Sequence, residues 1–268
     1  MLKIKDNEFR DLVAFIHDNY GVDLHKKRAL IEGRLGNYIP SLGYDNFGDY
    51  FKFAKNDKSG EELVTLLNRL TTNYTYFMRE REHFDFYANS ILPWIDKDLR
   101  TKDLRVWCAG CSTGQEPYTL ALLTLEYLGA AASSWDHTIL ASDISDRALA
   151  VAKKGLYPKS DFKEMPAEWV KKYFASFDEN QYSVNEKLKR SLAFRRFNLL
   201  DNFSFKKQFQ TIFCRNVMIY FDIPTKNTLI NKYYDWLVPG GYLLIGHSES
   251  LSGCTHRFRY VMPSVYQK

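Results

Sequence analysis

The sequence lacks the long apolar run that a membrane-spanning helix needs. None of its hydrophobic stretches approaches the roughly 20 consecutive apolar residues that cross a bilayer, and its opening residues, MLKIKD, are not typical of a signal peptide. We therefore expect a cytoplasmic protein that does not insert into a membrane. Its 268 residues are 45% hydrophobic and 16% aromatic, which is enough to bury a substantial core and makes disorder an unlikely class.

Metal-ligand and redox patterns are also scarce. There are four cysteines, and only Cys108 and Cys111 are closely spaced. This C-x-x-C is compatible with a redox pair or half of a zinc site, but Cys214 and Cys254 lie too far apart to supply the other half. The six histidines show no H-x-x-x-H spacing. The sequence therefore predicts no metal site and favours burial of Cys108 as a small apolar residue.

The charge excess is mild, because the net charge is only +5 and the isoelectric point is about 8.8. Such a balance permits an acidic partner and does not indicate nucleic acid. Basic residues gather in a helix predicted from Leu24 to Tyr38, which contains Lys26, Lys27, Arg28 and Arg34. From the residues alone, the simplest interpretation of this helix is a solvated surface.

The first 82 residues predict helices. Apolar residues recur at helical spacing after Phe9, and further helical runs cover residues 47–54 and 61–70. The polar stretch LTTNYTYFMRER follows. A helix starting near Thr75 is its simplest structural account, whereas a polar lining with Arg79 binding a carboxylate is the functional alternative.

The pattern changes at Asp103, after which short apolar strands alternate with helical runs. This rhythm is typical of a parallel sheet with helices on both faces; the predicted elements cover residues 104–108, 118–128, 138–141 and 145–154. The stretch VWCAGCSTGQEPY joins the first strand to a helix through Gly110 and Gly114. Such a turn lets the backbone approach a nucleotide-like ligand. It lacks an intact G-x-G-x-x-G, so it matches an NAD site poorly.

Polar residues follow two of the predicted strands. Asp143 ends the second strand, where an acid can accept hydrogen bonds from both ribose hydroxyls of a nucleoside. Arg215 and Asn216 interrupt the apolar run TIFCRNVMIYF at its carboxyl end. Because a buried Arg–Asn pair without partners would be costly, we expect a polar ligand nearby.

Residues 164–196 interrupt the alternation of strands and helices. Two short apolar runs, 181–184 and 192–197, flank a charged segment. We interpret them as a small hairpin-like insertion, after which the chain rejoins the main sheet.

Taken together, the motifs resemble the CheR family of chemotaxis receptor methyltransferases. The matching stretches are LTTNYTYFMRE, VWCAGCSTGQEPY, ASDIS, FNLLD, IFCRNVMIYF, LVPGGYLLIGHSE and PSVYQK, in the order of the family. The resemblance implies an α/β fold: a class I S-adenosylmethionine-dependent, Rossmann-like domain at residues 83–268, a small all-helical domain at residues 1–82, and a β-subdomain insertion at about residues 173–196.

The resemblance also implies roles for individual residues. Tyr220 matches the tyrosine near the reacting sulfonium, Glu116 a contact to the charged methionine portion, and Asp143 the ribose acid. The other expected cofactor contacts are Asn73, Thr75, Arg79, Asn198, Leu199, Arg215 and Asn216.

The implied reaction methylates glutamate carboxylates of chemoreceptors, with S-adenosylmethionine as cofactor and S-adenosylhomocysteine as product. The implied partner is the cytoplasmic helical region of these receptors, and peptide docking on the β-subdomain is an open alternative. The stretch HKKRALIEGRL resembles the substrate-facing helix of the family, which makes Lys26, Lys27, Arg28 and Arg34 candidate substrate contacts. In this sequence Gly36, Asn37 and Tyr38 follow Leu35, where relatives often have further arginines, so we expect this surface to be less basic.

Two other functions remain open at this point. One is a methyltransferase acting on another acceptor, and the other is a non-catalytic signalling protein that retains the cofactor fold. A methyltransferase of nucleic acid or of a small molecule does not account for the helical first part joined to RNVMIYF. The complete set Arg79, Glu116, Asp143, Asn216 and Tyr220 argues against a protein that has lost its activity.

Overall fold

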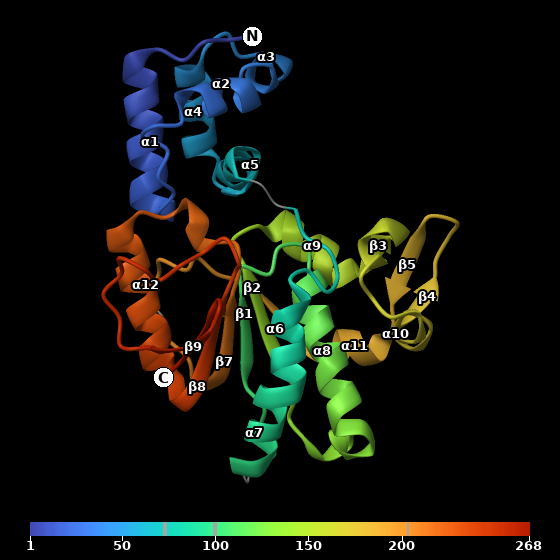
Figure 1. Cartoon of the computed structure of the whole chain (residues 1–268). Helices are drawn as coiled ribbons and strands as arrows, with labels where there is room; N and C mark the ends of the chain where they lie inside the picture. Colours follow the sequence, from blue (N-terminus) through green and yellow to red (C-terminus); the bar gives the residue numbers. More distant parts are fainter. Residues whose placement is uncertain (72–73, 99–100, 203) are drawn as a thin grey trace. The chain divides into compact units, whose positions relative to one another are not determined.

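The computed structural model describes residues 1–71, 74–98, 101–202 and 204–268 (Figure 1). The chain divides into two compact units, Met1–Tyr74 with Tyr220–Lys226, and Thr75–Ile219 with Asn227–Lys268. The expected boundary after residue 82 therefore differs from this division, because residues 75–82 belong to the second unit. Among the described residues, no helix combines the length and apolar character that crossing a bilayer requires.

The first unit contains short helices around one apolar core. They are α1 (Asp6–Tyr20), α2 (Arg28–Leu35), α3 (Tyr38–Ser41), α4 (Phe47–Asn56) and α5 (Glu61–Leu70). Their buried faces share one cluster that includes Leu12, Ile16, Ile31 and Leu66. Local signals set the helix ends: Gly21 ends α1 in the left-handed region, and the Asn46 side chain accepts the Asp49 N–H at the start of α4.

The helix predicted from Leu24 to Tyr38 is too long at both ends. The Asp23 carboxylate accepts the N–H of His25 at 3.1 Å, and this local turn competes with helix formation before Arg28. At the other end, the Gly36 carbonyl accepts the N–H of Leu2 at 2.9 Å. A Cβ on Gly36 would lie 2.6 Å from the Met1 Cγ atom, so glycine allows the amino-terminal segment to pack there.

A segment distant in sequence completes the first unit. Phe221 forms an antiparallel bridge with Val22, and the Asp23 N–H donates to the Tyr220 carbonyl at 2.8 Å. Tyr220 and Phe221 also pack against the helical core. The tyrosine expected near the reacting methyl group is therefore held by the helical unit.

The second unit is built on a seven-stranded sheet of order β6-β2-β1-β7-β8-β10-β9. The first five pair in parallel, and β10 pairs antiparallel with β8 and β9. The strands are β1 (Val106–Ala109), β2 (Ile139–Asp143), β6 (Leu192–Arg196), β7 (Phe209–Cys214), β8 (Leu237–Ile245), β9 (Arg259–Met262) and β10 (Val265–Gln267). Every residue of β1 and β7 is buried, as expected for parallel strands covered on both faces.

Side chains of β1 alternate between two layers of helices. Val106 and Cys108 join the core cluster that includes Phe84 of α6 (Arg81–Phe86) and Tyr118 of α8 (Gln115–Leu128). Trp107 points the other way and meets Tyr233 of α12 (Ile223–Trp236) with ring centroids 5.5 Å apart. A π-helical turn (Tyr87–Ile91) joins α6 to α7 (Leu92–Asp98), and α9 (Asp146–Lys154) follows β2. The helix expected to start near Thr75 begins instead at Arg81, after backbone in the left-handed region at Met78 and Glu80.

A smaller three-stranded sheet of order β3-β5-β4 is inserted before β6. Its elements are β3 (Leu156–Pro158), α10 (Ala167–Tyr173), β4 (Phe174–Ser176), β5 (Gln181–Val184) and α11 (Glu186–Arg190). The insertion expected at about residues 173–196 therefore starts earlier, and the expected pairing of 181–184 with 192–197 is wrong. The charged segment between them forms α11, capped by Asn185, so β6 returns to pair with β2.

The His17–Asp222 pair predicts a pH-dependent stability. His17 Nε2 lies 2.9 Å from Asp222 Oδ2, and the Asp222 and Asp18 carboxylates raise the pKa of His17 above its ordinary 6.5. Hydrogen bonds from Thr225 and His17 outweigh burial and lower the pKa of Asp222 from 3.8 to about 2. The histidine contribution is complete below pH 6.5 and is lost as pH rises through its raised pKa, whereas the aspartate contribution is lost as pH falls below 3.8.

We expect His17→Gln to lower the free energy of unfolding by ~0.2–1 kcal/mol near pH 5.5 and by less near pH 8.5. Urea unfolding of both proteins at the two pH values measures this difference. A loss that is the same at both pH values would show that the ionised pair does not contribute.

Candidate functional site

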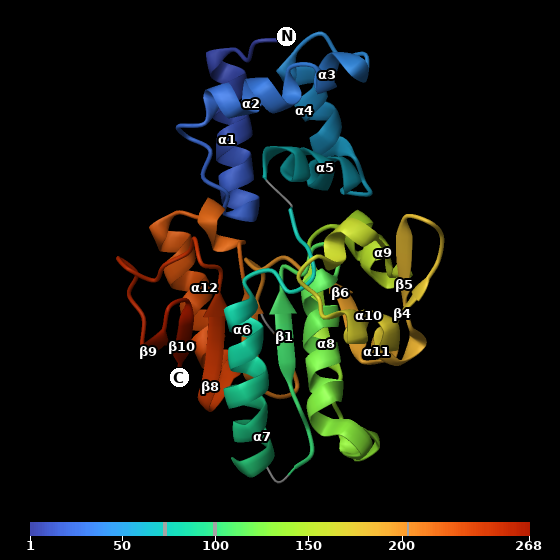
Figure 2. The ribbon, with the colours of Figure 1, turned by 45° about the vertical axis from the view of Figure 1, so that its right-hand side comes forward.

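The strand order of the second unit reverses beside β1. The chain runs from β1 to β2 and β6 on one side and then returns to β7 on the other side. In open α/β sheets, ligands bind at such a reversal, outside the carboxyl ends of the strands. Figure 2 shows this end of β1 at its arrowhead. The predicted Asp143, Arg215 and Asn216 all stand at the carboxyl ends of these strands.

The turn after β1 is shaped by two glycines. Gly110 has a φ of +86°, and a Cβ there would lie 2.4 Å from Val217 Cγ2. Gly114 has a φ of +99°, and a Cβ there would lie 2.8 Å from both Ala152 and the Tyr157 hydroxyl. Side chains at either position would be strained and would meet these neighbours. The two glycines are therefore required for close packing against these protein neighbours, and the approach of a ligand to this turn stays a prediction.

Asp143 fastens this turn to the end of β2. Its Oδ2 accepts the N–H of Ser112 at 2.7 Å, and its Oδ1 accepts the N–H of Ser145 at 2.9 Å. Burial raises the pKa of Asp143, although these backbone bonds oppose the shift. The Ile144 N–H also bonds to this carboxylate. A carboxylate offers about four lone-pair sites, so Asp143 retains capacity for a ligand hydroxyl. This arrangement fits a ribose.

Arg215 lies buried between two carboxylates. Its side chain is 2% exposed, its Nη1 donates to Glu116 Oε2 at 2.7 Å, and its Nη2 donates to Glu80 Oε2 at 3.0 Å. Nη2 also donates to the Arg79 carbonyl. The prediction of a nearby ligand assumed that a buried Arg215 would lack partners within the protein. That assumption is wrong, because protein groups already satisfy this guanidinium.

Glu116 lies in the first turn of α8 and receives two donors. Besides Arg215, the thiol of Cys108 donates to its Oε1 at 2.9 Å. The carboxylate of Glu116 is half-buried. A cationic ligand group approaching this carboxylate would meet an acceptor held in place by Arg215, which fits the role expected for Glu116.

Sequence reasoning gave no role to Glu80, which organises this network. Its Oε2 accepts from Arg215 and from the His247 N–H at 3.1 Å, and its Oε1 accepts from Asn216 Nδ2 at 3.2 Å. Burial would raise the pKa of Glu80, but the Arg215 charge outweighs it and the pKa is lowered. The signal available in the sequence was an acid between the two arginines of FMRER.

Glu249 was missed as well. Its carboxylate accepts the backbone N–H groups of Asn216 at 2.8 Å, Ile219 at 3.1 Å and Gly246 at 2.6 Å. The sequence predicted only that Glu249, in the motif GHSE, follows a strand. The spacing of residues in the sequence did not identify its backbone partners.

The remaining cofactor candidates lie nearby or outside this unit. The Phe197 N–H donates to the Asp143 carbonyl at 3.0 Å, which places the following Asn198 and Leu199 beside β2. Thr75 is half-buried and precedes Phe77, whose N–H bonds the carbonyl of Asp161. Asn73 lies outside the described residues, and Tyr220 belongs to the helical unit.

The basic candidates of the helical unit differ in their surroundings. Lys26 and Lys27 are exposed and precede α2. Arg28 donates to the Ile4 carbonyl and to Asp6 Oδ1, at 2.8 and 2.6 Å. Arg34 donates to the carbonyls of Arg69 and Thr71, at 3.1 and 2.8 Å. The two arginines therefore already bind groups within the unit, whereas the two lysines present the exposed charge.

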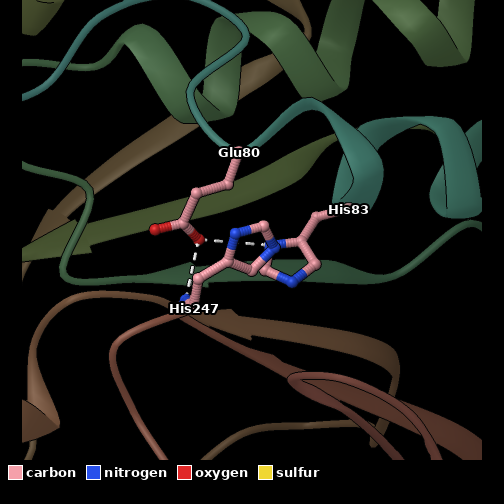
Figure 3. Close-up of side chains that lie close together, drawn as sticks. All are labelled: Glu80, His83 and His247. Atoms are coloured by element: carbon pink, nitrogen blue, oxygen red, sulfur yellow. Dashed lines mark hydrogen bonds and ion pairs between the residues drawn. The ribbon is translucent and has the colours of Figure 1, made fainter.

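Within the described residues, Glu80, His83 and His247 offer atoms that a metal ion could use (Figure 3). These atoms lie within 4.8 Å of one another, and burial chiefly lowers the pKa of His83 to about 3, so its ring is neutral. However, Glu80 Oε2 already accepts from Arg215 at 3.0 Å. A cation at this oxygen would face the guanidinium charge, so the group is better explained as part of the Arg215 network. The absence of a metal site stays a prediction.

Family comparisons cover both units. Residues 7–71 match the CheR methyltransferase all-alpha domain, and residues 73–266 match the CheR methyltransferase SAM binding domain. The second match confirms S-adenosylmethionine as the cofactor and, with the first, the expected fold class.

Relatives of known name match over almost their whole length. The chain is 39% identical over 272 residues to the chemotaxis protein methyltransferase of Borreliella burgdorferi, covering 100% of this chain and 96% of the relative. It is 33% identical over 270 residues to that of Escherichia coli, covering 99% and 92%. Because the family models cover both units and these relatives align over nearly all their length, the chain belongs to the CheR methyltransferase family.

Proposed function

We propose that this protein transfers the methyl group of S-adenosylmethionine to glutamate carboxylates of bacterial chemoreceptors, forming methyl esters. The observation that carries the proposal is the match of both units, helical and cofactor-binding, to chemotaxis protein methyltransferases over their whole length. The network around Arg215 supports it, because it provides charged groups suited to a zwitterionic cofactor.

The cofactor would lie across the carboxyl ends of β1, β2 and β7. In this arrangement Asp143 binds the ribose hydroxyls, Glu116 attracts the cationic amino group, and Arg79 attracts the carboxylate. Asn198 and Leu199 line the adjacent wall, and Arg215 and Asn216 complete the site. Thr75 and Asn73 are further contacts that the family resemblance assigns.

The proposed reaction does not require the protein to transfer a proton. S-adenosylmethionine supplies a methyl group on a positively charged sulfur. A glutamate side chain has an ordinary pKa of about 4.3, so the acceptor is ionised at neutral pH and needs no general base. Opposite charges disappear during transfer, so the protein contributes chiefly by holding the groups in line and excluding water. We assign Tyr220 to orienting the methyl-donor end rather than to proton transfer.

The proposed partner is the cytoplasmic helical region of chemoreceptors, which presents carboxylates. Lys26 and Lys27 supply exposed positive charge for it, and the partly buried Arg28 and Arg34 are further proposed contacts. In the small sheet, β3 and β4 are the edge strands, and a receptor C-terminal peptide could add a strand to such an edge. With such a partner we also propose a cytoplasmic location, and nucleic acid is not a proposed partner.

Methylation of another acceptor is less well supported, because the helical match belongs to the same family as the catalytic match. A non-catalytic cofactor-binding protein would not need the set that the chain retains: Arg79, Glu116, Asp143, Asn216 and Tyr220.

Alkali lability of the transferred methyl group tests the acceptor. We expect radiolabel transferred to receptor-containing membranes to leave as methanol under mild alkali, because methyl esters hydrolyse and N-methyl groups do not. Activity should also show no loss on acidification from about pH 8 to pH 6, since the carboxylate is already ionised. Label that survives alkali would reject the glutamate assignment and leave methyltransferase activity intact.

Exposed lysines test the receptor surface. We expect Lys26→Glu with Lys27→Glu to raise the apparent KM for receptor by up to about tenfold at low salt and by less at high salt, because exposed ion pairs contribute ~0.2–1 kcal/mol each and are screened. Cofactor affinity should not change.

The matched control reverses Lys52 and Lys58, which are exposed lysines of the same unit. It changes net charge equally, so it should leave the KM for receptor near that of wild type. Equal effects of the two double variants would assign the change to net charge and not to this surface.

A further inference from the structure

Glu249 is a buried carboxylate to which the proposed reaction gives no role, and it binds the backbone of the loop from Asn216 to Ile219. It follows β8, and it is buried with 8% of its surface exposed. Three backbone N–H groups, of Asn216, Ile219 and Gly246, donate to its two oxygens at 2.6–3.1 Å. The N–H of Met218 also faces this carboxylate and helps to lower a pKa that burial raises.

The loop from Asn216 to Ile219 has a conformation that needs such an acceptor. Asn216 has a φ of +59°, a left-handed value that non-glycine residues adopt at a cost. The N–H groups of Asn216 and Ile219 both donate to Glu249, and buried N–H groups without an acceptor are strongly unfavourable. A carboxylate is suited to this position because it only accepts hydrogen bonds and can accept several.

Packing from β8 adds a second constraint on the same loop. A Cβ on Gly246 would lie 2.4 Å from Asn216 Nδ2 and 2.8 Å from Asn216 N. The loop therefore sits directly against the end of β8. Glu249 binds the main chain of the loop, and Glu80 Oε1 accepts a hydrogen bond from Asn216 Nδ2 at 3.2 Å, which orients the Asn216 side chain.

This geometry gives the loop one defined shape at the carboxyl end of β7. Arg215 and Asn216 lie at its start, and Tyr220 directly follows its end in the chain. A change in the backbone between Asn216 and Ile219 redirects these side chains together.

We propose that Glu249 is a positioning residue for methyl transfer, which holds the Asn216–Ile219 backbone in the conformation that binds S-adenosylmethionine. The inference rests on the proposed function, because it takes Arg215 and Asn216 as cofactor contacts. Glu249 acts through these residues and does not itself touch the cofactor.

Glu249→Gln tests this role with almost no change in shape. The amide keeps one acceptor oxygen but turns an NH₂ group toward backbone donors, so at least one N–H of the loop loses its acceptor. We expect the KM for S-adenosylmethionine and the Kd of S-adenosylhomocysteine to rise about tenfold to a hundredfold. The KM for receptor should stay near that of wild type.

Two comparisons separate positioning from general loss of stability. Leu92→Ala removes a side chain that is 1% exposed in α7, and Figure 2 shows this helix toward the end of the sheet opposite the arrowhead of β1. It should lower the Tm and the active fraction, and hence the apparent kcat, while leaving the KM for the cofactor unchanged. Gly246→Ala, which presses on Asn216 without altering Glu249, should reproduce the raised cofactor KM if Glu249→Gln fails to fold.

The results also separate this inference from the proposed function. Asn216→Ala should weaken S-adenosylhomocysteine binding if the loop contacts the cofactor. If Asn216→Ala weakens binding and folded Glu249→Gln does not, the role of Glu249 is overturned. If Glu249→Gln does not fold, unchanged binding in Gly246→Ala overturns it instead. Unchanged binding in Asn216→Ala would overturn the assignment of the loop to the cofactor, and with it the inference.

Discussion

One buried positive charge determines much of the site. The Arg215 guanidinium is 2% exposed, and a charge taken so far from water is tolerated only where acceptors surround it. Glu80, Glu116 and the Arg79 carbonyl provide them. Arg79 and Glu80 belong to the loop before α6 and Glu116 to the first turn of α8, whereas Arg215 itself follows β7. Satisfying Arg215 therefore brings together three segments to which we assign cofactor contacts, and protein groups alone hold them in this arrangement.

Hydrogen bonds to two carboxylates also fix the loop that follows Arg215. Glu80 aims the side chain of Asn216, and Glu249 fixes the main chain from Asn216 to Ile219. The chain then passes at Tyr220 from the cofactor-binding unit to the helical unit, where Asp23 and Val22 hold it. The tyrosine to which we assign the methyl-donor end thus belongs to the same unit as the lysines proposed to bind the receptor.

The main sheet and its strand ends were predictable because their signals are local. The continuous apolar runs of β1 and β7 predict buried parallel strands, and Asp143 and Arg215 stand where those runs end. Glu80 and Glu249 were not predictable, because Glu80 meets Arg215 across 135 positions and no local pattern encodes such a contact. The expected pairing of residues 192–197 with residues 181–184 was wrong, because a short apolar run after a charged segment does not specify its partner. The start of α2 was misplaced because the Asp23 turn competes with helix formation.

The most direct test of the Arg215 network is calorimetric titration of Arg215→Lys with S-adenosylhomocysteine. Lysine keeps the positive charge but lacks the planar fork that reaches Glu80, Glu116 and the Arg79 carbonyl at once. The account predicts a folded protein whose affinity for S-adenosylhomocysteine falls at least about tenfold, because the two carboxylates are no longer held in register. Affinity equal to that of wild type would contradict it and show that charge alone, without the fork, is sufficient to build the site.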